Sequence, residues 1–373
     1  MIILYSDVLY HAGGIETYLH ALALHLHSEG MPFRVVVAEL EPCPVVDELV
    51  EKGIKVYRQR RLPGDRALVR QHFMLTWLRT QLKPGDWVFC LRQPMPELYF
   101  RMVRLVHSRQ ARIAASWMFA PKFLPPVPPH GEKFCQAVAQ TDAVISVSKC
   151  TAHQFKDVYG YTGQVHVVPL HNLLLFEEPV PLPSGSPWKI GFIGRLDIKQ
   201  KNLDTLLQAL VPVVQEWQYI ELHLYGRGRD QTQLEALAMS LGIQKHVVFH
   251  GAYDHRKDLP QIMANCHFFV YPSRFEGGPC FTLLEIMQAG RFCVAANVGG
   301  IPDLYKGFPE VGLLVSPDNP SELSQSIVTA LEQVASGSIN GNKIRDRYFD
   351  GFDMASAHRA WTSAISLEII PFS

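Results

Sequence analysis

Paired cysteines and long apolar runs are both missing from this chain. Its 7 cysteines are odd in number, lie scattered and never form a CxxC pair, which argues against a disulfide framework and against structural zinc. No stretch of about 18 apolar residues occurs, so we expect no transmembrane helix. The first residues enter an apolar strand without the charged and apolar regions of a signal peptide. Together these absences predict a protein of the reducing cytoplasm.

Several common catalytic motifs are absent as well. The patterns HExxH, GxxxxGKS/T and GxSxG do not occur, which removes the simplest metalloprotease, kinase and hydrolase interpretations. No DxD pattern occurs either, so nothing suggests a clamp of carboxylates and a metal ion around a diphosphate. We therefore expect neither a bound metal nor a cofactor.

Charge is balanced over the whole chain but not along it. The 373 residues are 47% hydrophobic and carry a formal net charge of +0, which fits a globular protein of two to three domains. Residues 1–175 hold 19 Lys and Arg against 14 Asp and Glu, a balance of +5, and the remainder has a balance of −5. A basic first half and an acidic second half predict two domains with different partners.

Residues 273–290 carry two carboxylates at a point where a ligand can bind. A short apolar run at 266–272 predicts a buried strand, and residues 281–289 have helical spacing closed by Gly290. Glu276 then lies in a glycine-containing loop at the carboxyl end of a strand, with Glu285 on the helix behind it. Ligands of open parallel sheets bind at that edge, and loop N–H groups favour anions and polyols. The alternative is a solvated glutamate before an ordinary amphipathic helix.

A second candidate site follows the apolar strand predicted at residues 188–194. Arg195 and Lys201 flank the start of a helix predicted at 203–214, where two cations and free N–H groups favour a diphosphate. Gly226 begins a turn after the next strand, predicted at 221–225. Near the start of the chain, Gly13 and Gly14 separate a strand at 1–4 from a helix at 15–27. That pair lets the backbone approach a phosphate, or it is simply a tight turn.

These stretches resemble the signatures of the retaining family 4 glycosyltransferases, which have the GT-B fold. The similar features are the GGIE loop at 13–16, the GRL sequence with a following lysine at 194–201, and the glutamates of 276–285. This chain has one residue more between Glu276 and Glu285 than the family usually has. The resemblance implies an α/β protein with two Rossmann-like domains facing across a cleft.

The same resemblance divides the chain and assigns roles to its residues. It implies an acceptor-side domain over 1–175, a Pro- and Ser-rich linker over 176–187, a nucleotide-sugar domain over 188–350, and a C-terminal helix in 351–373 that crosses back to the first domain. Arg195 and Lys201 would bind the diphosphate, Glu285 the ribose, and Glu276 the transferred sugar, with Glu276, Arg195 and Lys201 as the catalytic set. The remaining donor-binding residues would be Gly13, Gly14, Gly226, Gly277, Gly278, Pro279, Cys280, Phe281 and Thr282.

The acceptor is expected on loops of the first domain. Residues 117–131 hold five prolines, and Trp117 and Phe119 would give that rim an aromatic face for a sugar ring. Family members often have a histidine after the strand at 111–116; here that position is not histidine, and His11 and His130 are candidate substitutes. Arginine-rich stretches at 58–82 and 98–113 suggest peripheral contact with the inner face of a membrane or with an anionic acceptor, or else are solvated helix faces.

The sequence therefore predicts a retaining, metal-independent glycosyltransferase. Its partners would be a nucleoside diphosphate sugar, with UDP or GDP as the nucleotide, and a saccharide or lipid-linked acceptor, without nucleic acid. Two alternatives remain: a sugar-nucleotide epimerase or a phosphorylase on the same fold, and a non-catalytic protein that binds a sugar nucleotide or carbohydrate.

Overall fold

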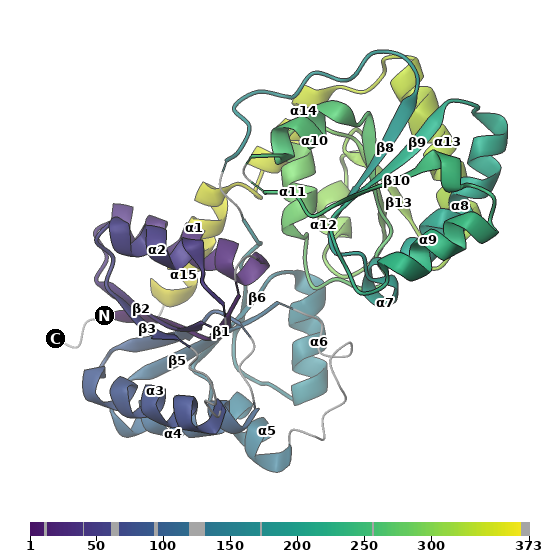
Figure 1. Ribbon diagram of the computed structural model, residues 1–373. Coiled ribbons are helices and arrows are strands. Elements are labelled where there is room, and N and C mark those ends of the chain that lie inside the picture. Colours follow the sequence, from purple (N-terminus) through teal and green to yellow (C-terminus); the bar gives the residue numbers. More distant parts are fainter. Residues whose placement is uncertain are drawn as a thin grey trace. The chain divides into compact units, whose positions relative to one another are not determined.

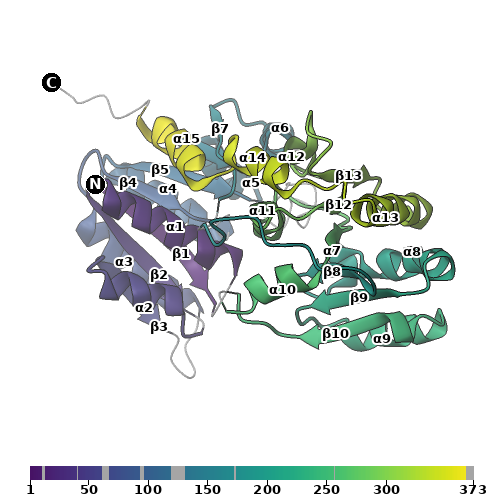
Figure 2. The same ribbon diagram turned by 90° about the horizontal axis from the view of Figure 1, so that it is seen from above.

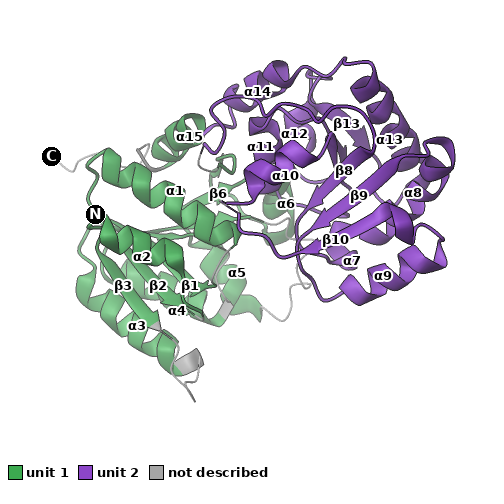
Figure 3. Cartoon of the chain, turned by 45° about the horizontal axis from the view of Figure 1, so that its top comes forward, with its two compact units in different colours: residues 1–172, 354–373 green, residues 173–353 purple. Residues whose placement is uncertain are grey.

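The chain divides into two compact units. The computed structural model describes residues 1–10, 13–39, 41–60, 67–92, 96–118, 131–171, 174–255 and 257–366. Unit 1 consists of residues 1–172 and 354–373, and unit 2 of residues 173–353 (Figure 3). Each unit is a parallel sheet covered by helices, so the α/β class expected from the sequence is confirmed for both.

Unit 1 is built on a seven-stranded parallel sheet with the order β3-β2-β1-β4-β5-β6-β7. Helices α1, α2 and α15 cover one face, and α3, α4 and α5 cover the other (Figure 1). The strands are β1 Ile2–Leu9, β2 Phe33–Glu39, β3 Val56–Arg60, β4 Trp87–Cys90, β5 Arg112–Trp117, β6 Ala143–Ser146 and β7 Val165–Val167. The helices are α1 Gly14–Ser28, α2 Pro44–Glu51, α3 Ala67–Gln81, α4 Pro96–Ser108, α5 Gly131–Ala139, α6 Lys149–Tyr159 and α15 Met354–Ser366.

The first strand is longer than its apolar run predicts. We expected it to end at residue 4, but β1 continues to Leu9 and stays paired with β2, with Ser6 opposite Val37 and Leu9 opposite Glu39. The polar residues after Tyr5 end the apolar pattern without ending the backbone hydrogen bonds. Buried polar side chains at the carboxyl end of a central strand are typical of a ligand-binding edge.

Unit 2 is built on a six-stranded parallel sheet with the order β10-β9-β8-β11-β12-β13. Helices α8, α9 and α13 lie side by side on one face, and α11 packs against α14 (Figure 2). The strands are β8 Trp188–Ile193, β9 Ile220–Tyr225, β10 Val247–Gly251, β11 Phe268–Tyr271, β12 Cys293–Ala296 and β13 Gly312–Val315. The helices are α7 Ile198–Lys201, α8 Leu203–Glu216, α9 Gln231–Ser240, α10 Leu259–Asn265, α11 Phe281–Gln288, α12 Pro302–Tyr305, α13 Pro320–Ala335 and α14 Gly341–Phe349, with a 3-10 turn at Gln244–His246.

Both sheets reverse the direction in which strands are added. In unit 2 the chain lays β9 and β10 on one side of β8 and then returns to place β11 on its other side, in register with Phe268 opposite Ile190. In unit 1 the same reversal occurs between β1 and β4. Ligands of open α/β sheets bind outside the carboxyl ends of the two strands that flank such a reversal.

The segment expected as a linker is bound to unit 2. Arg291 donates to the carbonyl oxygens of Val180 and Pro181, each at 2.7 Å, and Arg345 donates to that of Phe176 at 2.9 Å. Both arginines are buried, with exposed fractions of 1% and 6%. An extended, proline-rich segment leaves its carbonyls without partners of its own, and these guanidinium groups supply them.

The C-terminal helix α15 belongs to unit 1. It contacts α1 and β6, and its Trp361 is fully buried with its ring 5.5 Å from that of Phe89. Among the described residues, no helix is long and apolar enough to cross a membrane.

Candidate functional site

Two loops of unit 2 meet at the point where its strand order reverses. The loop of residues 194–202 follows β8, and the loop of residues 272–280 follows β11. Since β8 and β11 are neighbouring parallel strands, their carboxyl ends lie at the same edge of the sheet. The side chains predicted from the two sequence stretches are thereby brought together.

A buried ion pair joins these loops. The Lys201 ammonium donates to Glu276 Oε1 at 2.6 Å, and the two residues have exposed fractions of 9% and 5%. Removing two charges from water is unfavourable unless they are paired and hydrogen-bonded. The pair therefore places a cation and a carboxylate side by side at the sheet edge.

Arg195 is linked to this pair through one intermediate side chain. Its guanidinium donates to Gln200 Oε1 at 2.7 Å, and Gln200 Nε2 donates to Glu276 Oε2 at 3.4 Å. Arg195 is exposed, whereas Lys201 is buried. The site thus offers one accessible cation and one cation that is already paired.

A hydrogen-bond network around the half-buried Arg274 fixes the two loops to each other. The Arg274 backbone N–H donates to the Gln200 carbonyl at 2.8 Å, and the Arg274 side chain donates to Asp204 at 3.0 Å and to Asp318 at 2.5 Å. Asp197 caps α7 by accepting from the Gln200 N–H at 2.7 Å. These contacts therefore hold the loop that carries Lys201 against the loop that carries Glu276.

Glycine is required where neighbouring turns touch these loops. A Cβ added to Gly299, whose φ is +57°, would lie 2.0 Å from the carbonyl oxygen of Glu276. A Cβ added to Gly226 would lie 1.9 Å from the carbonyl oxygen of Gly194. No side chain fits at either distance, so both positions have a steric reason to be glycine. Gly226 is among the predicted site residues, and Gly299 is not.

The loop after Glu276 closes onto the start of α11. Gly277, Gly278 and Pro279 are buried, and Cys280, Phe281 and Thr282 are half-buried. Burial and the Glu276 carboxylate raise the pKa of the Cys280 thiol to about 12, so this cysteine remains protonated. It is therefore no nucleophile near neutral pH.

Glu285 lies on α11 with an exposed fraction of 2%, and a histidine from another loop contacts it. His255, which follows β10, has its Nε2 at 2.5 Å from Glu285 Oε1. Burial, and then the Glu285 carboxylate, raise the pKa of Tyr253 in the same loop. No sequence pattern singles out His255, since a histidine among charged loop residues is typical of a solvated turn.

A tyrosine that the sequence analysis also missed completes the Lys201 and Glu276 cluster. Tyr271 is the last residue of β11 and is 2% exposed. Its hydroxyl contacts the Lys201 ammonium and donates to Glu276 Oε1 at 3.3 Å. In an apolar strand a tyrosine is indistinguishable from a core residue until its hydroxyl is placed.

Of the site residues predicted in unit 1, Gly13 and Gly14 lie at the start of α1. Gly14 is the first residue of α1, and Gly13 precedes it in extended conformation with φ 171°. Two residues further on, Glu16 is 4% exposed and accepts from the Tyr10 N–H at 2.8 Å. Gly13 and Gly14 are thus at the reversal between β1 and β4. His11, Phe119 and His130 lie outside the described residues.

The prediction that Trp117 gives an aromatic face to an acceptor is wrong. Its side chain is fully buried in the core of unit 1, with ring centroids 4.6 Å from Phe155 and 5.7 Å from Tyr159. As the last residue of β5, it points into the layer between sheet and helices. A sugar ring has no access to it.

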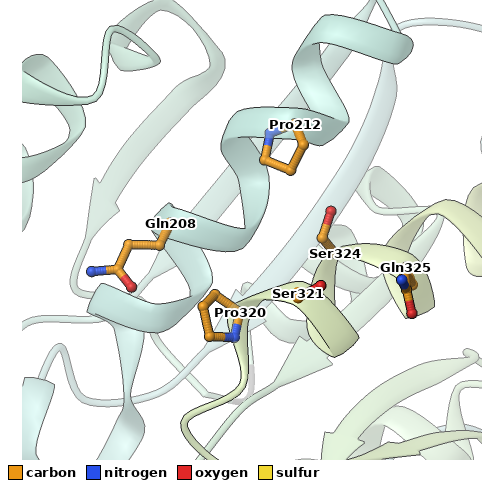
Figure 4. A pocket seen from close by; sticks show the side chains of 6 residues that line it. All are labelled: Gln208, Pro212, Pro320, Ser321, Ser324 and Gln325. Carbon is orange, nitrogen blue, oxygen red and sulfur yellow. The ribbon is translucent and has the colours of Figure 1, made fainter.

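No metal cluster competes with this site in the part of the chain that the structure describes. There, no group of three or more His, Cys, Asp or Glu side chains could hold a metal ion. A cavity of 360 Å³ between α8 and the start of α13 is lined by none of the predicted residues (Figure 4). Its lining consists of Gln208, Pro212, Pro320, Ser321, Ser324 and Gln325.

Models of two glycosyltransferase domains match the chain. The model described as Glycosyltransferase Family 4 matches residues 12–170, and that described as Glycosyl transferases group 1 matches residues 187–333. The first match falls in unit 1 and the second in unit 2.

Two curated relatives show the range of similarity. The phosphatidyl-myo-inositol mannosyltransferase of Mycobacterium tuberculosis is 30% identical over 47% of this chain and 44% of its own length. The D-inositol 3-phosphate glycosyltransferase of Xylanimonas cellulosilytica is 28% identical over 78% of this chain and 76% of its own length. The chain spans only 34% and 44% of the lengths of the first relatives that it matches.

Solved glycosyltransferase structures share the fold of the whole chain. HepE of Anabaena in complex with UDP has a TM-score of 0.74 at 19% identity, covering 98% of this chain and 100% of that one. The sucrose-phosphate synthase of Thermosynechococcus elongatus has a TM-score of 0.75 at 20% identity, covering 98% of each chain. By the domain matches of its two halves and by this likeness, the chain is built from two glycosyltransferase domains on the GT-B fold.

Proposed function

We propose that the chain transfers a sugar from a nucleoside diphosphate sugar to a saccharide or glycolipid acceptor, with retention of configuration and without a metal ion. The observation that carries this proposal is the pairing of Lys201 with Glu276 at the sheet edge, with Arg195 exposed beside them. A donor presents a polyanion and a polyol on one molecule. Adjacent cations and a carboxylate complement both parts.

In the proposed mechanism the enzyme supplies position and charge. The bond between the anomeric carbon and the phosphate oxygen breaks, and negative charge grows on the leaving diphosphate. Arg195 and Lys201 stabilise that charge more in the transition state than in the ground state. Glu276 and the N–H groups of the loop from Gly277 to Phe281 bind hydroxyls of the sugar, and Glu285 binds those of the ribose.

The acceptor hydroxyl attacks the anomeric carbon from the face that the diphosphate leaves. Its proton passes to an oxygen of the leaving diphosphate, so atoms and charge balance without a separate protein base. This route fits the site in unit 2, where the cysteine nearest to Glu276 is protonated and Glu276 itself is paired with Lys201. Arg195 and Lys201 take the part that a divalent metal plays in other diphosphate sites.

UDP and GDP are the nucleotides we propose. One structural neighbour was solved with UDP, and a relative's name specifies GDP-mannose dependence. Relatives that act on phosphatidyl-myo-inositol or on a diphospho-undecaprenol-linked sugar, by their names, support a glycolipid acceptor.

Contact with an anionic membrane surface would suit such an acceptor, and α3 offers a candidate surface. Val69 and Phe73 on this helix are 45% and 60% exposed, and Arg79 lies in its last turn. Apolar side chains next to cations favour the headgroup region of anionic bilayers. Flotation with anionic and with neutral vesicles tests this, and equal partitioning would identify α3 as a solvated helix.

Turnover separates a transferase from a sugar-binding protein. Purified protein is incubated with UDP- and GDP-sugars in EDTA, and release of the nucleoside diphosphate is followed with and without lipid extracts as acceptor. We expect release that persists in EDTA and is lost in Glu276→Gln. Donor binding without any release would favour a non-catalytic binding protein, conversion of the bound sugar to its epimer would favour an epimerase, and loss in EDTA restored by Mg²⁺ would exclude the metal-free mechanism.

A further inference from the structure

The Lys201 and Glu276 pair raises a question that the proposed function does not answer. In the free protein each group is the other's closest charged partner, at 2.6 Å. Under the proposed function, Lys201 must turn to a diphosphate and Glu276 to sugar hydroxyls. A group that contacts both would have to hold them in place while their direct contact weakens.

We propose that Tyr271 is a positioning residue for the donor, bridging Lys201 and Glu276 through its hydroxyl. This inference rests on the proposed function, because it concerns how the same site accepts a nucleoside diphosphate sugar. A tyrosine hydroxyl has one proton to donate and lone pairs to accept with. It can therefore accept from the ammonium and donate to the carboxylate at the same time.

The contacts of the Tyr271 hydroxyl fit this role. It accepts from Lys201 Nζ, and it donates to Glu276 Oε1 at 3.3 Å. Burial is the largest cause that raises the pKa of Tyr271 well above its ordinary value, followed by Cys280 and Glu276. The phenol therefore keeps its proton near neutral pH and can act as a donor there.

The ring of Tyr271 fixes where the hydroxyl lies. Lys201 Nζ is 4.6 Å from the ring centroid, a distance at which a cation is attracted to an aromatic ring. The ring also stacks with that of Phe192 on β8, with the ring centroids 6.2 Å apart and an angle of 20° between the ring planes. Tyr271 also ends strand β11, where its backbone is paired with Ala295 of β12. A Tyr271→Phe variant keeps the ring contacts and removes the hydroxyl that makes the bridge.

Loss of the bridge has a definite consequence for the donor. Without the hydroxyl, the ammonium of Lys201 has Glu276 as its remaining partner at this position. The diphosphate must then compete with Glu276 alone for this ammonium, in an ion pair that no bridge weakens. Hydrogen bonds to charged groups are worth enough to change binding by about ten- to a hundredfold. The effect should fall on ligands with a diphosphate, because Lys201 is the group that loses its orientation.

The test compares Tyr271→Phe with wild type and with Tyr305→Phe. Tyr305 is also buried in unit 2, and its hydroxyl donates to the Cys293 carbonyl at 3.2 Å rather than to Lys201 or Glu276. Calorimetry measures binding of UDP and GDP, and of UMP and GMP, to all three proteins. We expect Tyr271→Phe to weaken diphosphate binding about tenfold or more, to change monophosphate binding much less, and Tyr305→Phe to change neither.

Equal diphosphate affinity in Tyr271→Phe and wild type would overturn the inference and leave the proposed function standing. An equal loss for monophosphates and diphosphates would show general damage to the site, and would also overturn it. If wild type bound neither UDP nor GDP, the proposed function would fail, and a donor-positioning role for Tyr271 with it.

A second measurement needs no ligand. Unfolding of Tyr271→Phe, of Glu276→Gln and of the double variant gives the coupling between the two side chains. For a bridging hydroxyl we expect the unfolding constant of the double variant to differ by about three- to a hundredfold from the value calculated from the two single variants. Strict additivity would show that the hydroxyl and the carboxylate do not act together.

Discussion

At the scale of single residues, Arg195 and Lys201 belong to one sequence pattern but have different surroundings. Arg195 is exposed and bonded to Gln200, whereas Lys201 is buried against Glu276. A surface cation costs little stability when it is removed. A buried one leaves its partner as an unpaired charge in the interior, which is strongly destabilising.

The two alanine substitutions should therefore separate binding from stability. Arg195→Ala should weaken UDP or GDP binding about ten- to a hundredfold and leave the midpoint of urea unfolding unchanged. Lys201→Ala should weaken binding and also lower the free energy of unfolding by about 3–5 kcal/mol. Lys199→Ala, an exposed lysine on the same helix α7, is the control for both readouts. Identical behaviour of the Arg195 and Lys201 variants would contradict this division.

The residues that the sequence predicts, and those it misses, follow from one physical difference. Arg195, Lys201 and Glu276 could be found because carboxyl ends of parallel strands meet at one sheet edge, and the strands are visible as apolar runs. Tyr271 and His255 could not, because their roles depend on a hydroxyl and an imidazole reaching partners on other loops. Trp117 was misplaced because a strand-end tryptophan has the same sequence pattern whether it faces the core or the solvent.

At the scale of elements, the best predictions were those with strong apolar periodicity. The strand expected at 266–272 contains β11, and the helix expected at 281–289 is α11, closed by Gly290 at φ +68°. Helices α2, α6 and α14 were missed, since they are short or carry many polar residues. Their helical state depends on packing against the sheets, which local sequence does not encode.

Gly299, in the turn after β12, lies against the backbone of the loop that carries Glu276. An alanine there meets the Glu276 carbonyl and also adopts a left-handed conformation at φ +57°. Gly307 is the matched control, because its φ is +81° and a Cβ there meets nothing within 4 Å. Both alanines should lose about 1–2 kcal/mol in unfolding free energy from backbone strain, and Gly299→Ala should lose more because its Cβ would overlap the Glu276 carbonyl. Only Gly299→Ala should also lose UDP or GDP binding in calorimetry, and equal binding by the two variants would count against the contact.

Docking of α15 on unit 1 should depend on pH. His358 on this helix lies 3.0 Å from His171, nitrogen to nitrogen, and its ring stacks on His25 at 3.7 Å. Burial first, and then the two neighbouring histidines, lower the pKa of His358 to about 3. Below the unfolded pKa of about 6.5, the unfolded chain takes up a proton that the folded protein refuses.

Stability should therefore be complete above about pH 6.5 and fall as the pH decreases toward 3, by up to about 1.4 kcal/mol per pH unit for this proton. Urea unfolding at pH 7.5, 6.0 and 5.0 measures the slope, and His358→Gln should reduce it. His153→Gln is the control, because that histidine is 80% exposed on α6. An unchanged slope in His358→Gln would assign the pH dependence to other groups.

At the scale of the whole molecule, the charge asymmetry predicted two domains, whereas their α/β class and their bounds came from the resemblance to a family. The Pro- and Ser-rich stretch at 176–187 has the composition of a linker, and nothing local marks it as bound. Its partners are Arg291 and Arg345, more than a hundred residues later in the sequence. Such a contact joins distant parts of the chain, so only the folded unit reveals it.

These contacts predict how unit 2 can be cut from the chain. A fragment of residues 174–353 keeps the carbonyls of Phe176, Val180 and Pro181 that Arg345 and Arg291 bind at 2.7–2.9 Å, whereas a fragment of residues 188–350 loses them. Each lost bond to a buried guanidinium removes about 1.5–3 kcal/mol, against a total stability of about 5–15 kcal/mol for a typical domain. In urea, followed by circular dichroism, the shorter fragment should unfold at a clearly lower midpoint or fail to fold. Arg291→Lys in the longer fragment keeps the charge but loses the fork of donors, so its midpoint should fall in between. Equal midpoints for the two fragments would mean that residues 174–187 are a linker in energy as well as in composition.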